Sequence, residues 1–148
     1  MSVYITKEFI SEVSLLLKNS SHKDCDKEII NHIFNSTIEE IKLNGCKRLG
    51  GDPNKSPFLR KRIETENTGK SSGYRLYFWL MIQEKNVYLL YIHPKTGRRS
   101  GTNLTAEKQK ELVKTFINHR KDNLFIEIEV QNNSIVYSSS KKTKDLVF

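Results

Sequence analysis

The stretch that decides the fold is Gly73-Tyr-Arg-Leu-Tyr-Phe-Trp-Leu-Met-Ile82. Its aromatic and aliphatic residues run almost without interruption, which predicts a β-strand that is covered on both faces. Alternation assigns the side chains to two faces: Tyr74, Leu76, Phe78, Leu80 and Ile82 lie on one, and Arg75, Tyr77, Trp79 and Met81 on the other. Because a buried charge is costly without a partner, we expect Arg75 to reach solvent or a ligand.

A second apolar strand, Val87-Tyr-Leu-Leu-Tyr-Ile-His93, follows the first. The intervening Gln83-Glu-Lys-Asn86 has the composition of a turn, so the two strands are predicted to form an antiparallel hairpin. Pro94 ends the second strand and begins a basic turn, Pro94-Lys-Thr-Gly-Arg-Arg-Ser-Gly101.

Upstream of this hairpin, the sequence predicts a loop and then an edge strand. Residues 45–57 are rich in glycine and proline, which is typical of a loop. Residues 58–65 alternate without a purely apolar face: Phe58, Arg60, Arg62 and Glu64 lie on one side, and Leu59, Lys61, Ile63 and Thr65 on the other. A strand of this kind suits the edge of a sheet, where charged side chains remain accessible.

The N-terminal third predicts two amphipathic helices. The first covers residues 6–19, with Thr6 as its N-cap and apolar residues at helical spacing. The second runs from about residue 24 to residue 44, and Gly45 ends it. A short polar link joins the two helices, so we expect an antiparallel helical hairpin that packs on another surface.

Downstream of the basic turn, a helix is predicted from the cap Thr105 to about His119. Two further strands, at 124–131 and 134–138, are joined by the turn Asn132-Asn133. The polar tail 139–148 is expected to be flexible, with docking of its last three residues as the alternative.

These elements predict an α+β fold in a single domain, residues 1–148. An N-terminal helical hairpin (1–46) packs on a small, mostly antiparallel sheet, which forms a core with one further helix (55–118). A C-terminal β-hairpin (124–138) and the flexible tail (139–148) complete the chain.

Composition narrows the class of protein. The chain has 148 residues, enough for one ordinary domain, and no apolar run approaches the roughly 20 residues that span a bilayer. No signal peptide is evident, so we expect a cytoplasmic protein that does not bind a membrane. Its two cysteines are expected to be free thiols, and its four histidines lack metal-ligand spacing, so neither a metal nor a cofactor is expected.

The net charge of +8 is concentrated around the central strands. Residues 1–46 carry five Lys/Arg against seven Asp/Glu, whereas residues 47–75 carry eight against three. Residues 93–101 add three basic residues and no acid. Clustering of this kind indicates a binding site for a polyanion, although a merely solvated basic face is the alternative.

The residue types near the central strands suit RNA. Cations for phosphate binding are Arg60, Lys61, Arg62, Lys70, Arg75, Lys95, Arg98 and Arg99. Candidate platforms for base stacking are Tyr77, Trp79, Tyr88 and Tyr91, of which Trp79 and Tyr91 fit the core better. Cleavage without metal needs a base, an acid and a cation beside the phosphate, and His93 or a lysine with a lowered pKa could act as the base. The alternative for His93 is a packing residue at the end of its strand.

The pattern Lys61-Arg62, Gly69-Lys-Ser-Ser-Gly-Tyr-Arg-Leu76, Val87–Ile92, Lys95 and Asn103-Leu-Thr105 resembles the RelE/ParE superfamily of bacterial toxins, closest to the HigB-like branch. The resemblance covers roughly residues 55–118. It implies a helical hairpin on a small antiparallel sheet, and a metal-independent endoribonuclease that cleaves mRNA on the ribosome. Its partners would be the ribosome, mRNA and a neutralising antitoxin protein.

Carried over by residue, the resemblance makes Arg75 the arginine that contacts the scissile phosphate. Lys61 and Arg62 resemble the basic pair of the preceding strand, where a lysine acts as base. Lys95, or Arg98 or Arg99, would be a second phosphate-binding cation. The family's tyrosine after this turn has no counterpart here, since no tyrosine occurs between Tyr91 and Tyr137, and His93 is the candidate to replace it. The alternatives are a ParE-like inhibitor of DNA gyrase and an RNA-binding module without activity; the oligomeric state is not predicted.

Overall fold

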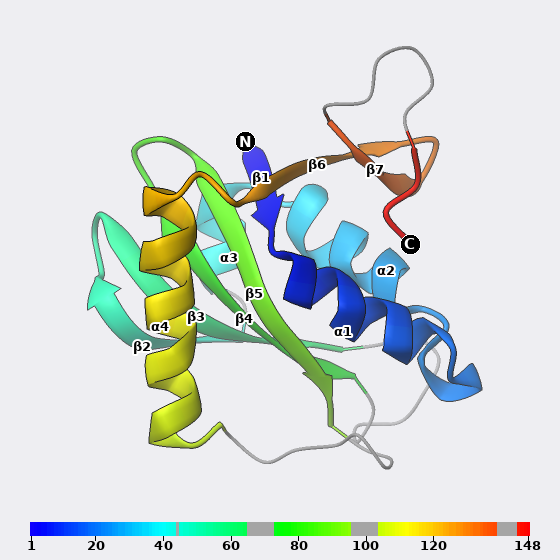
Figure 1. The fold of residues 1–148 in the computed structure, drawn as a ribbon, viewed down its shortest axis with the longest axis horizontal. Coiled ribbons are helices and arrows are strands. Elements are labelled where there is room, and N and C mark those ends of the chain that lie inside the picture. Colours follow the sequence, from blue (N-terminus) through cyan, green and yellow to red (C-terminus); the bar gives the residue numbers. More distant parts are fainter. Residues whose placement is uncertain (44, 65–72, 96–103, 139–144) are drawn as a thin grey trace.

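A seven-stranded sheet in the order β2-β3-β4-β5-β1-β6-β7 forms the centre of the molecule (Figure 1). The structure is a computed structural model that describes residues 1–43, 45–64, 73–95, 104–138 and 145–148. The strands are β1 (Ser2–Ile5), β2 (Cys46–Asp52), β3 (Ser56–Ile63), β4 (Tyr74–Met81), β5 (Asn86–Pro94), β6 (Ile126–Gln131) and β7 (Ser134–Tyr137). All neighbouring strands are antiparallel except β1 and β5, so the prediction of an α+β fold with a mostly antiparallel sheet is confirmed.

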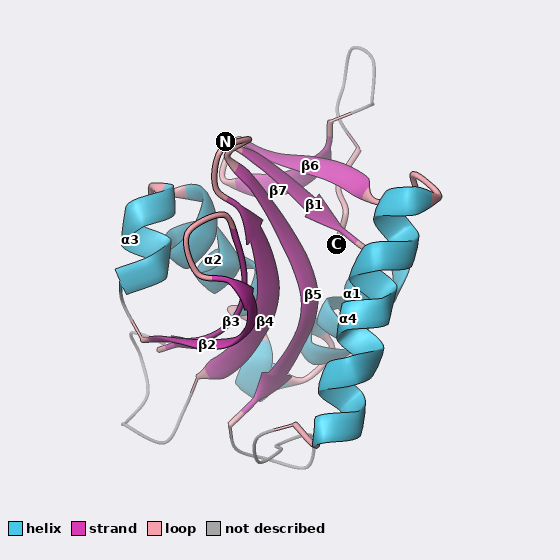
Figure 2. Ribbon diagram, turned by 90° about the vertical axis from the view of Figure 1, so that its left-hand side faces the viewer, coloured by secondary structure: helices cyan, strands magenta, loops and turns pink. Residues whose placement is uncertain are grey.

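Helices cover both faces of this sheet (Figure 2). They are α1 (Lys7–Leu17), η1 (Ser20–His22), α2 (Cys25–Ile29), the π-helical turn η2 (Ile30–Phe34), α3 (Ile38–Leu43) and α4 (Ala106–Lys121). Apolar residues of α1, α2, η2 and α3 share one buried cluster with one face of the strands, and α4 packs on the other face. We call these the α1–α3 face and the α4 face. No helix in the described parts of the chain is long and apolar enough to cross a membrane.

Strand β4 divides its side chains between the two faces as predicted. Tyr74, Leu76, Phe78 and Leu80 belong to the core of the α1–α3 face, whereas Tyr77, Trp79 and Met81 belong to that of the α4 face. The hairpin with β5, the Thr105 cap of α4 and the β6–β7 hairpin with its Asn132-Asn133 turn are also confirmed.

The single helix expected over residues 24–44 is wrong. The chain forms three shorter segments there, α2, η2 and α3. The hydroxyl of Thr37 accepts a hydrogen bond from the Glu40 backbone N–H, and the Glu40 carboxylate accepts one from the Thr37 N–H. This reciprocal capping box starts a new helix at α3, so the expected pair of long antiparallel helices is not what forms.

The loop expected over residues 45–57 is also wrong, because most of it is strand. β2 and β3 form a hairpin whose turn is closed by Asp52, which accepts hydrogen bonds from the backbone of Asn54 and Lys55. The glycines permit a bulge between Arg48 and Gly50, and Gly51 has a φ of +72°. Consequently β3 is not an edge strand, since it lies between β2 and β4.

Both ends of the chain are paired with the sheet. β1, for which no strand was predicted, lies parallel to β5. At the other end, Leu146 forms a bridge with Val136, and Val147 is buried and donates its backbone N–H to the Ile135 carbonyl. The predicted flexible tail is therefore wrong for residues 145–148, and its alternative, docking of the last residues, is the arrangement found.

Candidate nucleic-acid interface

Three basic side chains form a row across the α4 face of the sheet. Arg62 of β3 is the register partner of Arg75 of β4, and Arg75 is the partner of His93 of β5. Directly opposed residues of antiparallel strands project from the same face and are closest neighbours, so the row spans roughly 10 Å. Arg62 is exposed and Arg75 is half-buried, as the sequence required of a charge within an apolar strand.

A second row lies beside the first, two residues along each strand. Here Lys47 of β2 opposes Arg60, Arg60 opposes Tyr77, and Tyr77 opposes Tyr91. Lys47 is exposed and Arg60 is half-buried. The two rows together bring Lys47, Arg60, Arg62 and Arg75 onto one face, which we call the cationic face; it can bind several phosphates of a polyanion.

Tyr77 does not provide a stacking platform, contrary to the sequence-based expectation. Its side chain is 0% exposed, and its hydroxyl accepts a hydrogen bond of 3.4 Å from the Leu104 backbone N–H. The approach of residue 104 to the sheet covers a ring that alternation had placed correctly beside Arg75. Tyr91 is only partly buried, and the Lys108 ammonium lies 5.2 Å from the centre of its ring.

Gly73 sets the start of β4 beside this face. Its φ is +122°, and a Cβ at this position would lie 2.3 Å from the carbonyl oxygen of Ile63. Any other residue would therefore be strained and would push β3 and β4 apart. Glycine here keeps Arg62 and Arg75 in register.

His93 is buried at the end of the first row, 5% exposed. Its ring packs near those of Tyr77 and Tyr91, at centroid distances of 5.9 and 5.8 Å. Nδ1 lies 3.2 Å from the Pro94 carbonyl oxygen, so this nitrogen carries the proton and Nε2 has the lone pair. Nε2 is buried and has no hydrogen-bond partner among the described residues.

Burial lowers the pKa of His93 from its ordinary value of 6.5, and the positive charges of Arg75 and Arg60 lower it further. The hydrogen bond with Pro94 opposes the shift and does not overcome it. The imidazole is accordingly neutral at pH 7, and a neutral imidazole with a free Nε2 can accept a proton.

Lys61 does not belong to the cationic face, so it does not lie beside Arg75 as its predicted role of catalytic base assumed. Its register partners are Cys46 and Leu76, so its side chain enters the α1–α3 face. It is 2% exposed and its ammonium lies 3.4 Å from the Ile41 carbonyl oxygen. Burial lowers the pKa of Lys61, and the neighbouring Cys46 opposes that shift.

Replacing Lys61 with methionine is expected to leave nucleic-acid binding unchanged and to raise the free energy of unfolding at pH 7, because a buried charge is removed. Between the lowered pKa of Lys61 and the value of 10.5 in the unfolded chain, the unfolded state binds more protons. The stability of the wild type should therefore rise with pH in this window, and the advantage of Lys61→Met should shrink. Chemical denaturation at pH 7 to 10 measures both effects on stability. A large loss of RNA binding in Lys61→Met would contradict the prediction and would mean that Lys61 takes part in the binding site.

Lys95 is the one remaining predicted site residue that lies within the described ranges, directly after the end of β5. Lys95 is half-buried, and its backbone N–H donates to the Gly73 carbonyl, which continues the β4–β5 pairing. Lys95 is therefore next to Gly73, two residues from Arg75 along β4. Lys70, Arg98 and Arg99 lie outside the described residues.

Lys47 and Lys108 were not predicted from the sequence as residues of the candidate site. Lys47 joins the cationic face only because residues 46–52 form a strand, and recognition of that strand would have identified it.

No group of three or more metal-ligating side chains occurs in the described ranges. Both cysteines, Cys25 and Cys46, are free thiols, as predicted.

Comparison with known protein families, with curated proteins and with solved structures finds no match to this chain.

Proposed function

We propose that this protein is a metal-independent endoribonuclease that binds RNA on the cationic face. The observation that carries the proposal is the row Arg62, Arg75 and His93, which combines two guanidinium groups with a neutral imidazole. Guanidinium groups bind phosphate through paired, charge-assisted hydrogen bonds. The imidazole supplies the proton acceptor that attack by an RNA hydroxyl requires.

In the proposed reaction, His93 Nε2 takes the proton of a ribose 2′-OH, and the 2′ oxygen forms a bond to the adjacent phosphorus. Arg75 and Arg62 stabilise the negative charge that develops on the phosphoryl oxygens. The bond from phosphorus to the 5′ oxygen then breaks, and this oxygen takes a proton from Lys95. The products are a 2′,3′-cyclic phosphate and a 5′-hydroxyl end.

The buried Nε2 also supports this role. A buried nitrogen without a hydrogen bond carries a free-energy cost. A substrate hydroxyl would provide the donor that the described residues do not. Since His93 is 5% exposed, the side chains around it must move for this hydroxyl to enter.

The resemblance to the RelE/ParE superfamily supports a more specific proposal, in which the substrate is mRNA on the ribosome and an antitoxin protein neutralises the enzyme. A cytoplasmic location follows from that target. The most specific part of the resemblance is Gly73-Tyr-Arg75. The close approach of Gly73 to the Ile63 carbonyl explains why a glycine precedes Arg75 by two residues.

Mapping of RNA 5′ ends after a short pulse of expression tests this function. We expect growth arrest and new 5′-hydroxyl ends confined to translated regions of mRNA. Intact mRNA during arrest would contradict the proposal, and loss of DNA supercoiling with intact mRNA would favour a gyrase inhibitor instead.

The burial of His93 favours one second candidate, an RNA-binding module without catalytic activity. In that case the cationic face would hold RNA while Nε2 stays covered. Binding of single-stranded RNA without cleavage, both on and off the ribosome, would distinguish this function from the nuclease.

A further inference from the structure

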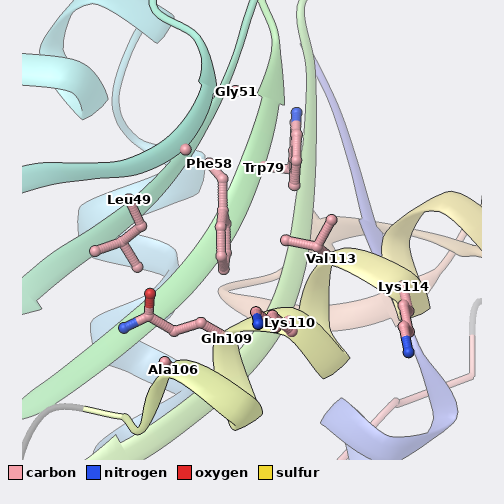
Figure 3. Close-up of a pocket in the computed structure, with 10 residues that line it drawn as sticks. Leu49, Gly51, Phe58, Trp79, Ala106, Gln109, Lys110, Val113 and Lys114 are labelled. Atoms are coloured by element: carbon pink, nitrogen blue, oxygen red, sulfur yellow. The ribbon is translucent and has the colours of Figure 1, made fainter.

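An apolar groove lies on the α4 face, beyond the end of the cationic face. It has a volume of about 470 Å³ and lies between β2 and α4. Leu49 and Val113 line opposite sides, with Phe58 and Trp79 between them (Figure 3). Phe58 precedes Arg60 by two residues on β3, so the groove and the cationic face are neighbours. The row of Arg62, Arg75 and His93 does not line the groove.

The rim of the groove on α4 is positively charged. Lys110 and Lys114 both line it, are exposed, and are four residues apart, which places them one above the other on the same side of the helix. Neither forms an ion pair with the described residues. An apolar floor beside two unneutralised cations is complementary to an apolar side chain flanked by carboxylates.

The groove suits a protein segment better than a nucleobase. Phe58 is 1% exposed and Trp79 is 8% exposed, because their rings stack on each other at 5.2 Å and Trp79 also stacks on Phe116 at 4.4 Å. A base therefore finds little open aromatic surface on which to stack. The amide group of Gln109 donates to the Leu104 carbonyl, which leaves few donors for the edges of a base.

The β2 wall of the groove is open where Gly50 lies. A Cβ built on Gly50 meets no atom within 4 Å, and the residue does not have a positive φ. The neighbouring Arg48 donates to the Gly51 carbonyl at 2.9 Å and so covers part of the edge of β2. This protection disfavours addition of a further strand and favours a helix as the occupant.

We propose that this groove binds an amphipathic acidic helix of a partner protein. An apolar side chain of the helix inserts between Leu49 and Val113, and acidic side chains one turn apart pair with Lys110 and Lys114. Because the groove lies outside the row of Arg62, Arg75 and His93, this inference does not depend on nuclease activity.

The test uses a displayed library of helical 18-residue peptides with randomised surface positions. Selected peptides should be rich in Glu and Asp around a Leu, Ile or Phe. Trp79 is the only tryptophan in the chain, so its fluorescence reports occupancy of the groove directly. We expect a saturable fluorescence change at a ratio of one peptide to one protein.

Two variants decide whether the peptides bind in the groove. Gly50→Leu fills it and should weaken binding by at least about tenfold, with the thermal midpoint confirming the fold. The double variant Lys110→Glu/Lys114→Glu should lower the affinity for acidic peptides by about tenfold. The control Lys42→Glu/Lys55→Glu has the same change in net charge and should leave that affinity unchanged. Neither groove variant should change RNA cleavage. Failure of the docking proposal can therefore be distinguished from failure of the proposed nuclease function.

Failure to recover any peptide that binds at Trp79 would overturn the proposal. Affinity that is unchanged in Gly50→Leu would place the peptides elsewhere and would also overturn it. A single-stranded RNA oligonucleotide that changes Trp79 fluorescence and displaces the peptides would assign the groove to nucleic acid instead.

Discussion

Arg75→Ala is expected to slow RNA cleavage by about 100- to 1000-fold, the usual effect of removing one group that stabilises developing negative charge. Arg75 lies at the centre of the first row, between Arg62 and His93, and is the partly exposed charge of an otherwise buried strand. The protein should remain folded, because the removed side chain belongs to neither core cluster. Single-turnover cleavage of ribosome-bound mRNA measures the rate, and the thermal midpoint checks the fold.

Two further variants separate the geometry of Arg75 from its charge. Arg75→Lys keeps the charge but loses the planar fork of donors, so its cleavage rate should fall between those of the wild type and Arg75→Ala. Lys55→Ala removes one positive charge from the exposed β2–β3 turn and should cleave at the wild-type rate. Equal losses in Lys55→Ala and Arg75→Ala would mean that only the net charge matters, and a wild-type rate in Arg75→Ala would remove it from the site.

Much of the sheet could be predicted because a period of two is a local property. The two faces of β4, the hairpin with β5 and the β6–β7 hairpin all follow from alternation and turn residues. The position of β1 next to β5 could not be predicted in the same way. Four residues carry too little pattern, and their pairing partner lies more than eighty residues away.

The N-terminal helices and β2 were mispredicted for different reasons. The apolar period continues across residues 24–44, so only the Thr37–Glu40 capping box marked the break before α3. In β2, the composition of Gly50 and Gly51 indicated a loop, whereas these residues serve a bulge within a strand. Glycine is compatible with both structures, and pairing with β3 decides between them.

For the candidate site, alternation was a better guide than resemblance. Alternation places Lys61 on the face opposite Arg60 and Arg62, and the register confirms this. The resemblance made Lys61 a candidate base beside Arg75, although adjacent residues of a strand project from opposite faces of the sheet. Tyr77 was placed on the correct face, but its burial depends on residue 104, which is distant in sequence.

His93→Asn is expected to lower the cleavage rate by about 100- to 10,000-fold, the range that general base catalysis contributes. Asparagine can still form a hydrogen bond with the Pro94 carbonyl but cannot accept the proton. In the wild type the rate should fall at acidic pH, as His93 becomes protonated. Since burial, Arg75 and Arg60 lower the pKa of His93, the midpoint of this fall should lie below 6.5.

Arg60→Gln tests whether that acidic limb belongs to His93. Removing the positive charge of Arg60 should raise the pKa of His93 and move the midpoint of the rate profile to higher pH, whatever the loss in RNA affinity. The same shift has a consequence for stability. Between pH 6.5 and the lowered pKa, the unfolded chain binds more protons, so the unfolding free energy of the wild type should fall as the pH falls, and less so in His93→Asn. If His93→Asn keeps the wild-type rate and pH profile while this stability effect is observed, His93 is a buried structural residue and another group takes the proton of the 2′-OH.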